Sequence, residues 1–388
     1  IQKLYFNHKN EKAYLKIGSY QTPLIEIDPD SGKTNLISYP SFGGNLPYDF
    51  DFDLNGLLYI QSVHFLNRYD ITTSPMHEVP FDYGQDKGGG FTSVIMFPHQ
   101  GGHDFPYCGL SVNVNGDILV ATPVVGAPNR DPKKGGNSGD TNTEYHPLGF
   151  PGRAQGGFPD GIVNIWDKYG KLKITEPIGG AMKYDGAFID KDLNVYVIAV
   201  PQRQINGKNL PFDFDGGSST LMKFRKGADA KFYSASPGVP LPIRPDQYPK
   251  RHKEIEGYWI GGYEWLYGGV GYAGFGINNI TGCACWYTRW RLDYFARSFV
   301  PATLLYEVAV LDSAGNLILK IGQYGNADSK GKNSKEPLGG DEVGLYYPSF
   351  VTTHTDRRVF ISDYGNQRIL SVKLKYMVDE TMPVKILH

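Results

Sequence analysis

Residues 281–329, TGCACWYTRWRLDYFARSFVPATLLYEVAVLDSAGNLILKIGQYGNADS, form the stretch that decides the fold of this chain. Its second half predicts a β-hairpin, because residues 304–311 and 316–322 are apolar runs separated by the turn residues 312–315. The segment 290–299 is the longest helix candidate in the sequence, although its aromatic residues also suit an irregular loop.

Composition points to many short strands joined by turns. The chain has 388 residues with 48 Gly, 26 Pro, 27 Tyr and 21 Phe, and only 20% of its residues are charged. Long amphipathic helices need more Ala, Glu and Lys than this. We therefore expect an all-β protein.

The hairpin unit of the opening stretch recurs along the chain. Each copy has two apolar runs around a polar turn of the Asp/Asn-x-x-Gly kind, followed by a second hairpin. Copies lie at residues 4–37, 48–79, 110–175, 186–234, 274–322 and 348–376. Four antiparallel strands per repeat are typical of a β-propeller blade. Six blades are countable, and the gaps 81–107 and 235–273 have room for another, so we predict a seven-bladed β-propeller.

We expect residues 1–388 to form this propeller as a single domain, with long inter-strand loops and a ring closed between the two ends of the chain. The net charge of −1 argues against nucleic acid as a partner. No stretch is apolar enough for a membrane span. The chain begins with Ile1, which we interpret as processing after export.

Three long interruptions between the repeats are the places where function is expected. The first, residues 81–107, contains His99 and His103 around two glycines, and the second, residues 123–159, is rich in Gly, Pro, Asn and Asp. The third begins at residue 244 and is charged in a lightly charged chain. We call its residues 246–256 the finger, and we expect it to reach toward another subunit.

The finger contains the candidate site residues. Carboxylate oxygens suit hard cations such as Mg²⁺ or Ca²⁺, and burying carboxylates is costly unless a cation accompanies them. The predicted metal ligands are Asp246, Glu254 and Glu256, and the residues predicted to face a partner are Asp246, Arg251, His252, Lys253, Glu254 and Glu256. The alternative is a solvated loop held by its own Lys and Glu pairs.

Other residues leave alternatives open. Cys283 and Cys285 share a strand face and, with Cys108, suit a thiolate metal site, a disulfide between two of the three, or buried structural thiols. We predict that Cys283 and Cys285 are structural. His99 and His103 have metal-ligand spacing only on a helix, which the glycines between them oppose.

Two acidic groups are also ambiguous. The alternating carboxylates Asp49, Asp51 and Asp53 either line a channel or bind calcium, or they form the polar edge of a first strand. Asp213 and Asp215 raise the same question, with a turn as the alternative. A metal-dependent hydrolase or lactonase-like propeller, working through its central channel, is therefore the second functional hypothesis.

The phrases GNLILKIGQYGN (residues 315–326) and RRVFISDYGNQRILSV (357–372) resemble the NHL family of β-propellers. That resemblance implies a fold and a binding role. No CxxCH haem attachment motif occurs in the sequence, so haem chemistry would have to come from a partner.

Taken with this absence, the segments CACWYTRWRLDYFARSF (283–299) and PDQYPKRHKEIEGYW (245–259) resemble the β subunits of hydrazine synthases from anaerobic ammonium-oxidising bacteria. The resemblance implies a haem-free, non-catalytic subunit. It also implies haem-bearing α and γ partner subunits, which carry haem c and make hydrazine from nitric oxide and ammonium, and a location in the anammoxosome.

Overall fold

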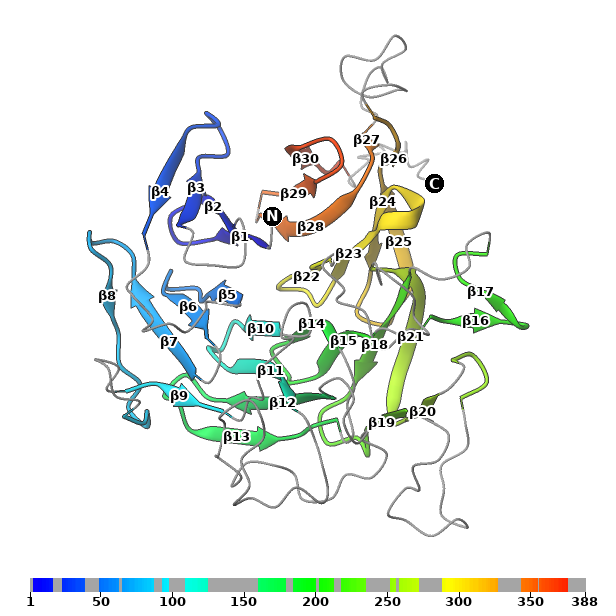
Figure 1. The fold of residues 1–388 in the computed structure, drawn as a ribbon, viewed down its shortest axis with the longest axis horizontal. Helices are drawn as coiled ribbons and strands as arrows, with labels where there is room; N and C mark the ends of the chain where they lie inside the picture. Colours follow the sequence, from blue (N-terminus) through cyan, green and yellow to red (C-terminus); the bar gives the residue numbers. More distant parts are fainter. Residues whose placement is uncertain are drawn as a thin grey trace, which may run out of the picture.

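The computed structural model describes residues 3–16, 23–38, 49–62, 65–86, 93–97, 109–124, 160–178, 184–199, 202–212, 218–234, 252–255, 258–271, 288–326, 343–354 and 356–375. Its strands form six blades arranged around a common axis, which Figure 1 views end-on. The prediction of an all-β propeller is confirmed.

The first three blades are antiparallel sheets, and the strands of each are named in order from the axis outward. Blade one holds β1 (Lys3–Asn7), β2 (Lys12–Lys16), β3 (Leu24–Ile27) and β4 (Thr34–Ile37). Blade two holds β5 (Asp49–Phe52), β6 (Leu58–Gln61), β7 (Phe65–Asp70) and β8 (His77–Glu78), with β9 (Ile95–Met96) also paired to β7. Blade three holds β10 (Gly109–Val112), β11 (Ile118–Val124), β12 (Asp160–Trp166) and β13 (Leu172–Thr175).

The remaining three blades follow the same plan. Blade four holds β14 (Tyr184–Ile189), β15 (Val195–Ala199), β18 (Ser219–Phe224) and β21 (Tyr263–Val270). Blade five holds β22 (Arg291–Leu292), β23 (Ser298–Ala302), β24 (Glu307–Leu311) and β25 (Leu317–Ile321). Blade six holds β28 (Pro348–Thr353), β29 (Arg358–Asp363) and β30 (Arg368–Lys373).

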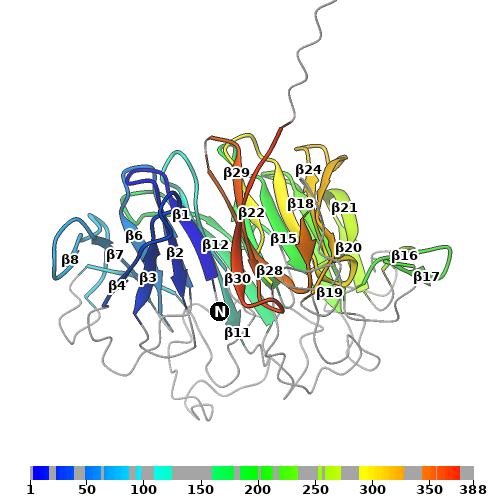
Figure 2. The ribbon, with the colours of Figure 1, turned by 90° about the horizontal axis from the view of Figure 1, so that it is seen from above.

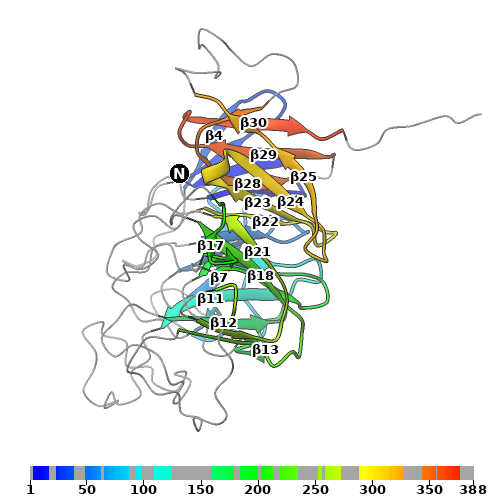
Figure 3. The same cartoon turned by 90° about the vertical axis from the view of Figure 1, so that its right-hand side faces the viewer.

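Small elements decorate the blades. They are the pairs β16 (Gln204–Ile205) with β17 (Lys208–Asn209), β19 (Lys231–Ser234) with β20 (Tyr258–Gly261), and β26 (Gln323–Tyr324) with β27 (Gly344–Leu345), and the 3₁₀ helix η3 (Thr303–Leu305). The β16–β17 hairpin projects outward from the rim of the disc (Figures 1 and 2) and lies on the side that faces the viewer in Figure 3. The part of the chain described here contains no helix long and apolar enough to cross a bilayer.

A repeated turn joins the two inner strands of most blades. In four of these turns a side-chain oxygen accepts hydrogen bonds from the backbone N–H groups two and four residues later, at 2.8–3.0 Å. The four accepting residues are Asp53, Asn113, Asp190 and Asp293. Such Asx turns stabilise a tight reversal, as the repeat in the sequence predicted.

The fourth residue of each turn is left-handed, and this explains one wrong prediction. Glycine takes that position at Gly56 and Gly116, but Leu193 (φ 66°) and Ala296 (φ 58°) take it in blades four and five. Glycine is the usual residue there because it has no Cβ. Without a glycine signal, residues 290–299 resembled a helix, whereas they form the β22–β23 hairpin.

The outer half of blade four also differs from the sequence prediction. Residues 220–234 were expected to form one hairpin, but β19 pairs with β20 and the fourth strand of the blade is β21. An insertion therefore separates the third and fourth strands, and the finger lies within it. In blade five, the hairpin predicted at 304–322 is confirmed, with its first strand beginning at Glu307 after η3.

The two ends of the chain meet as predicted, by packing of whole blades. β1 lies against β28, and the Phe6 and Phe360 rings stack with centroids 5.6 Å apart. Blue and orange strands are accordingly neighbours in Figure 1. The described strands close this ring with six blades. In the gaps 81–107 and 235–273, β9 pairs with β7 of blade two, β20 pairs with β19, and β21 is the fourth strand of blade four. The seventh blade stays a prediction for residues outside those described.

Candidate functional site

The root of the finger is anchored on blade four. The Arg203 guanidinium donates to Glu254 Oε2 at 2.7 Å, and the Gln204 N–H donates to the Glu254 carbonyl at 2.6 Å. Arg203 also donates to the carbonyl of Leu266 in β21 at 2.7 Å. The predicted ligand Glu254 is therefore an ion-pair partner of Arg203 in this structure.

His252 is held beside Glu254 in its neutral form. The Glu254 N–H donates to His252 Nδ1 at 3.1 Å, so the ring proton sits on Nε2, which lies 2.8 Å from the Tyr263 hydroxyl oxygen. Burial lowers the pKa of His252, although Glu254 acts in the opposite direction. Lys253 is exposed. Of the predicted finger residues, these three are described; Asp246, Arg251 and Glu256 lie outside the described residues.

The strongest anchor of the root is apolar. Ile255 is fully buried in the blade-four core, in a cluster that includes Val195 and Ile260. Burying an Ile side chain contributes roughly 1.5–3 kcal/mol. The Arg203–Glu254 pair is partly exposed, at 22% and 41%, and contributes about 0–1 kcal/mol. Ile255 therefore contributes more than the ion pair to holding residues 252–255 on blade four.

The alternating aspartates of β5 lie at the propeller axis, and their role is structural. Asp49 pairs with Lys3 of blade one and accepts from the Leu110 N–H at 3.0 Å. Asp51 accepts from Arg291 of blade five at 2.9 Å and from the Val112 N–H at 2.9 Å. Both carboxylates therefore join blade two to blade three and are neutralised by protein cations.

Asp53 completes this set as the acceptor of its own turn, and burial raises the pKa of its carboxyl. Within the described ranges, no three His, Cys, Asp or Glu side chains converge as a metal site. Asp49 and Asp51 are thus buried links between blades, a role that neither alternative described. Cys108, Cys283, Cys285, His99, His103, Asp213 and Asp215 lie outside the described residues, and their predicted roles stay predictions.

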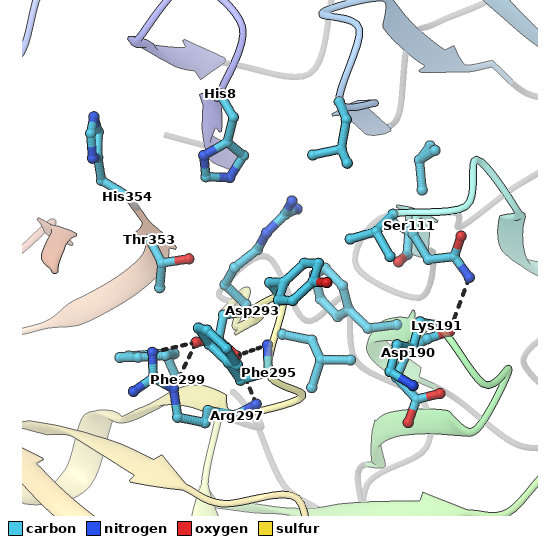
Figure 4. A pocket seen from close by; sticks show the side chains of 18 of the residues that line it. His8, Ser111, Asp190, Lys191, Asp293, Phe295, Arg297, Phe299, Thr353 and His354 are labelled. Atoms are coloured by element: carbon cyan, nitrogen blue, oxygen red, sulfur yellow. Dashed lines mark hydrogen bonds and ion pairs between the residues drawn. The ribbon is translucent and has the colours of Figure 1, made fainter. Parts of the chain in front are cut away.

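A pocket of about 540 Å³ opens on the axis, at the end where the inner strands finish. All six blades contribute to its lining, and we call it the axial pocket. Figure 4 shows His8 and His354 on one side, Ser111, Asp190 and Lys191 on the other, and Asp293, Phe295 and Arg297 along a third. Ring closure alone brings these turns together, so the pocket was not predicted from the sequence.

Burial sets the charges of the histidines in the axial pocket. Burial, the Arg291 guanidinium and His354 lower the pKa of His8 to about 4. Burial also lowers the pKa of His354, against the opposing effect of Asp356. Both imidazoles are therefore neutral near pH 7.

Arg291 keeps its charge at the base of the axial pocket. Burial opposes that charge, but Asp51 raises the pKa of Arg291. Its guanidinium carbon lies 5.0 Å from the centre of the Tyr5 ring and 5.6 Å from that of Phe188, which adds cation–π stabilisation.

Three of the solved structures similar to this chain show how low the sequence identity is. The PQQ domain of pyranose dehydrogenase from Coprinopsis cinerea is 11% identical, with 96% of this chain and 92% of that chain covered and a TM-score of 0.45. A gluconolactonase from Xanthomonas campestris is 12% identical, with coverage of 95% and 84% and a TM-score of 0.43. Virginiamycin B lyase from Staphylococcus aureus is 9% identical, with coverage of 97% and 85% and a TM-score of 0.40.

These likenesses concern the fold alone. At such identities and TM-scores they carry no argument about activity or ligands. No protein-family model matches the chain, and no curated protein matches it.

Proposed function

We propose that this chain is the haem-free propeller subunit of a multi-haem complex that makes hydrazine from nitric oxide and ammonium. It acts as a scaffold, is not itself catalytic, and directs its charged finger toward the active site or a tunnel of a partner subunit. The proposal rests on the resemblance of residues 245–259 and 283–299 to hydrazine synthase β subunits. Its partners would be haem-bearing α and γ subunits within the anammoxosome.

The anchoring of the finger root is the observation that supports this role best. A segment that presents charged groups to a partner needs a fixed base, because each group ordered at binding otherwise costs conformational entropy. Ile255 in the blade-four core and the three hydrogen bonds donated by Arg203 and Gln204 supply that base. The base lies in an insertion, so the blade itself is complete without the finger.

A metal ion on the finger is the less supported part of the proposal. Glu254 already accepts from Arg203, and this arrangement fits an ion pair better than a Mg²⁺ or Ca²⁺ shell. Asp246 and Glu256 are the remaining proposed ligands. No step of a reaction is assigned to the metal.

The hydrolase alternative needs free carboxylates in the channel. Asp49 and Asp51 are occupied by Lys3, Arg291 and two backbone N–H groups. A catalytic ion would have to displace these buried partners, which is unfavourable because a buried cation would be left unpaired. The described part of the channel therefore does not favour this alternative.

Co-purification tests the assembly. An affinity-tagged full chain, expressed in its native host, should elute in size-exclusion chromatography together with proteins that show haem c absorption, and the pool should form hydrazine from nitric oxide and ammonium. Elution of the chain alone, or with partners free of haem, would contradict the proposal.

A second experiment tests the finger. The double variant Glu254→Gln and Glu256→Gln keeps the shape of both side chains and removes their charges. We expect it to assemble normally and to lower hydrazine formation at least about tenfold. Glu264→Gln, in β21 of the same blade, is the matched control and should retain activity. Normal assembly with unchanged activity and bound metal would show that the finger is only surface.

A further inference from the structure

The axial pocket has the features of a binding site for a small ligand, separate from the finger. Its volume of about 540 Å³ lies within the range of roughly 300–1,000 Å³ that is usual for small-molecule sites. The walls are mainly apolar, and a few polar groups converge on them. This combination favours a ligand with an apolar body and few polar atoms.

Arg291 provides the polar anchor at the base of the axial pocket. The residue is nine-tenths buried, with 9% exposure, and donates from Nη1 to Asp51 Oδ1 at 2.9 Å. A guanidinium has five N–H donors in a planar fork, and among the described residues Asp51 is the acceptor that Arg291 uses. The edge formed by Nε and Nη2 is therefore available for a second carboxylate, in the bidentate geometry that arginine favours.

The formal charges of Arg291, Arg357, Asp51 and Asp190 balance one another around the axial pocket. Asp51 neutralises Arg291, while Arg357 on the pocket rim has no acidic partner among the described residues. Asp190 also lines the axial pocket, but its carboxylate accepts four hydrogen bonds within its own blade, from Asp192, Asn194 and Tyr196. These four donors are neutral, so Asp190 keeps its negative charge and balances Arg357. A ligand carboxylate would therefore be held by the N–H donors of Arg291 and not by an excess of positive charge.

Aromatic side chains provide the apolar surface. Phe52 and Phe188 form buried walls, and Phe295 is 69% exposed although it lines the axial pocket. An exposed aromatic ring at the edge of a concave site is a common ligand platform. His8 and His354 are neutral near pH 7, so they add no cation beside Arg291.

We propose that the axial pocket binds a small organic monocarboxylate with an aromatic or branched aliphatic body. The carboxylate lies on the free edge of Arg291, and the body packs against Phe52, Phe188 and Phe295. This function is independent of the proposed role of the finger, since the two sites involve different residues.

Calorimetric titration of the purified full chain tests the ligand class. The probes are phenylacetate, isovalerate and the uncharged isostere phenylacetamide. We expect saturable one-to-one binding of at least one acid and binding of the amide at least about tenfold weaker, because only the acid fills the arginine fork. Equal binding of acid and amide, or no saturation by either acid at millimolar concentration, would overturn the proposal.

Variants locate the binding site. Arg291→Lys keeps a cation for Asp51 but loses the fork, and it should weaken binding of the acid at least about tenfold with little effect on the amide. Phe295→Ala should weaken both probes by a similar factor, about tenfold, because the platform is lost. The matched control Phe212→Ala removes a phenylalanine that is 58% exposed elsewhere. Unchanged binding in Phe295→Ala, in a chain with normal circular dichroism, would place the ligand at another site.

Discussion

The axis and the finger root each hold a carboxylate beside an arginine, but the two pairs do different work. Asp51 and Arg291 are buried, with side chains 1% and 11% exposed, and they join blades two and five across the ring. Glu254 and Arg203 are partly exposed and join neighbouring elements at the rim. Low polarity makes the first pair costly to break, whereas water solvates either partner of the second.

This difference shows which of the two carboxylates can exchange its ion-pair partner. A carboxylate that accepts from a buried arginine and a backbone N–H cannot leave without stranding both donors. Glu254 has an exposed side of its own, so it can exchange Arg203 for a partner's group at little cost. The predictions below separate these two situations.

The largest effect is expected for Asp51→Asn. This change leaves Arg291 charged and buried without an acidic partner, and it should lower the free energy of unfolding by about 3–5 kcal/mol. Urea denaturation followed by fluorescence measures it. Asp192→Asn, in an exposed pair with Lys191, is the control and should change stability by less than about 0.5 kcal/mol. A similar small loss in Asp51→Asn would mean that the axial pair is not sequestered.

The second prediction concerns the loss of folding stability that His8 causes at acid pH. The unfolded side chain binds a proton below about pH 6.5, whereas the folded one does so only near 4. The unfolded state therefore holds more protons in this window, and stability falls as the pH drops through it, by about 3 kcal/mol at most. His8→Asn should flatten that part of the stability profile.

Urea denaturation at intervals between pH 7 and pH 4 measures the profile. His77→Asn, which changes an exposed histidine of β8, should leave the slope as it is in the unaltered protein. An identical slope in His8→Asn would show that other groups cause the acid sensitivity.

The smallest effect is expected for Glu254→Gln at the finger root, and Ile255→Ala is its contrasting variant. Glu254→Gln should change the free energy of unfolding by less than about 1 kcal/mol, since the lost pair is partly exposed. Ile255→Ala removes the apolar anchor and should cost about 2–4 kcal/mol or release the root locally. Limited proteolysis distinguishes them: cleavage near residue 255 should accelerate in Ile255→Ala and stay slow in Glu254→Gln. The reverse order would make the ion pair the true anchor.

Much of the fold could be predicted from the sequence because its causes are local. Alternating apolar residues define strands, and Asp or Asn at the start of each turn defines hairpins, so six blades were located before any contact was known. The prediction failed where local signals were missing. Ala296 occupies a glycine position in blade five, and the insertion before β21 separates two strands that pair with each other.

The candidate sites were also predictable from the sequence only in part. Composition alone marked the finger, since a run of charged residues in a lightly charged chain has no place inside a blade. It did not show that Glu254 would pair with Arg203, which lies 51 residues away.

The ion pairs and the pocket at the propeller axis could be described only from the tertiary structure. Asp51 and Arg291 are separated by 240 residues, and no local pattern joins them. Closure of the ring places the ends of six inner strands around one point, which creates the buried pairs and the axial pocket together. The sequence by itself thus determined the strands, the turns and the charged insertion, because these depend on neighbouring residues. Which charges became structural and which residues line a pocket depended on packing between distant blades.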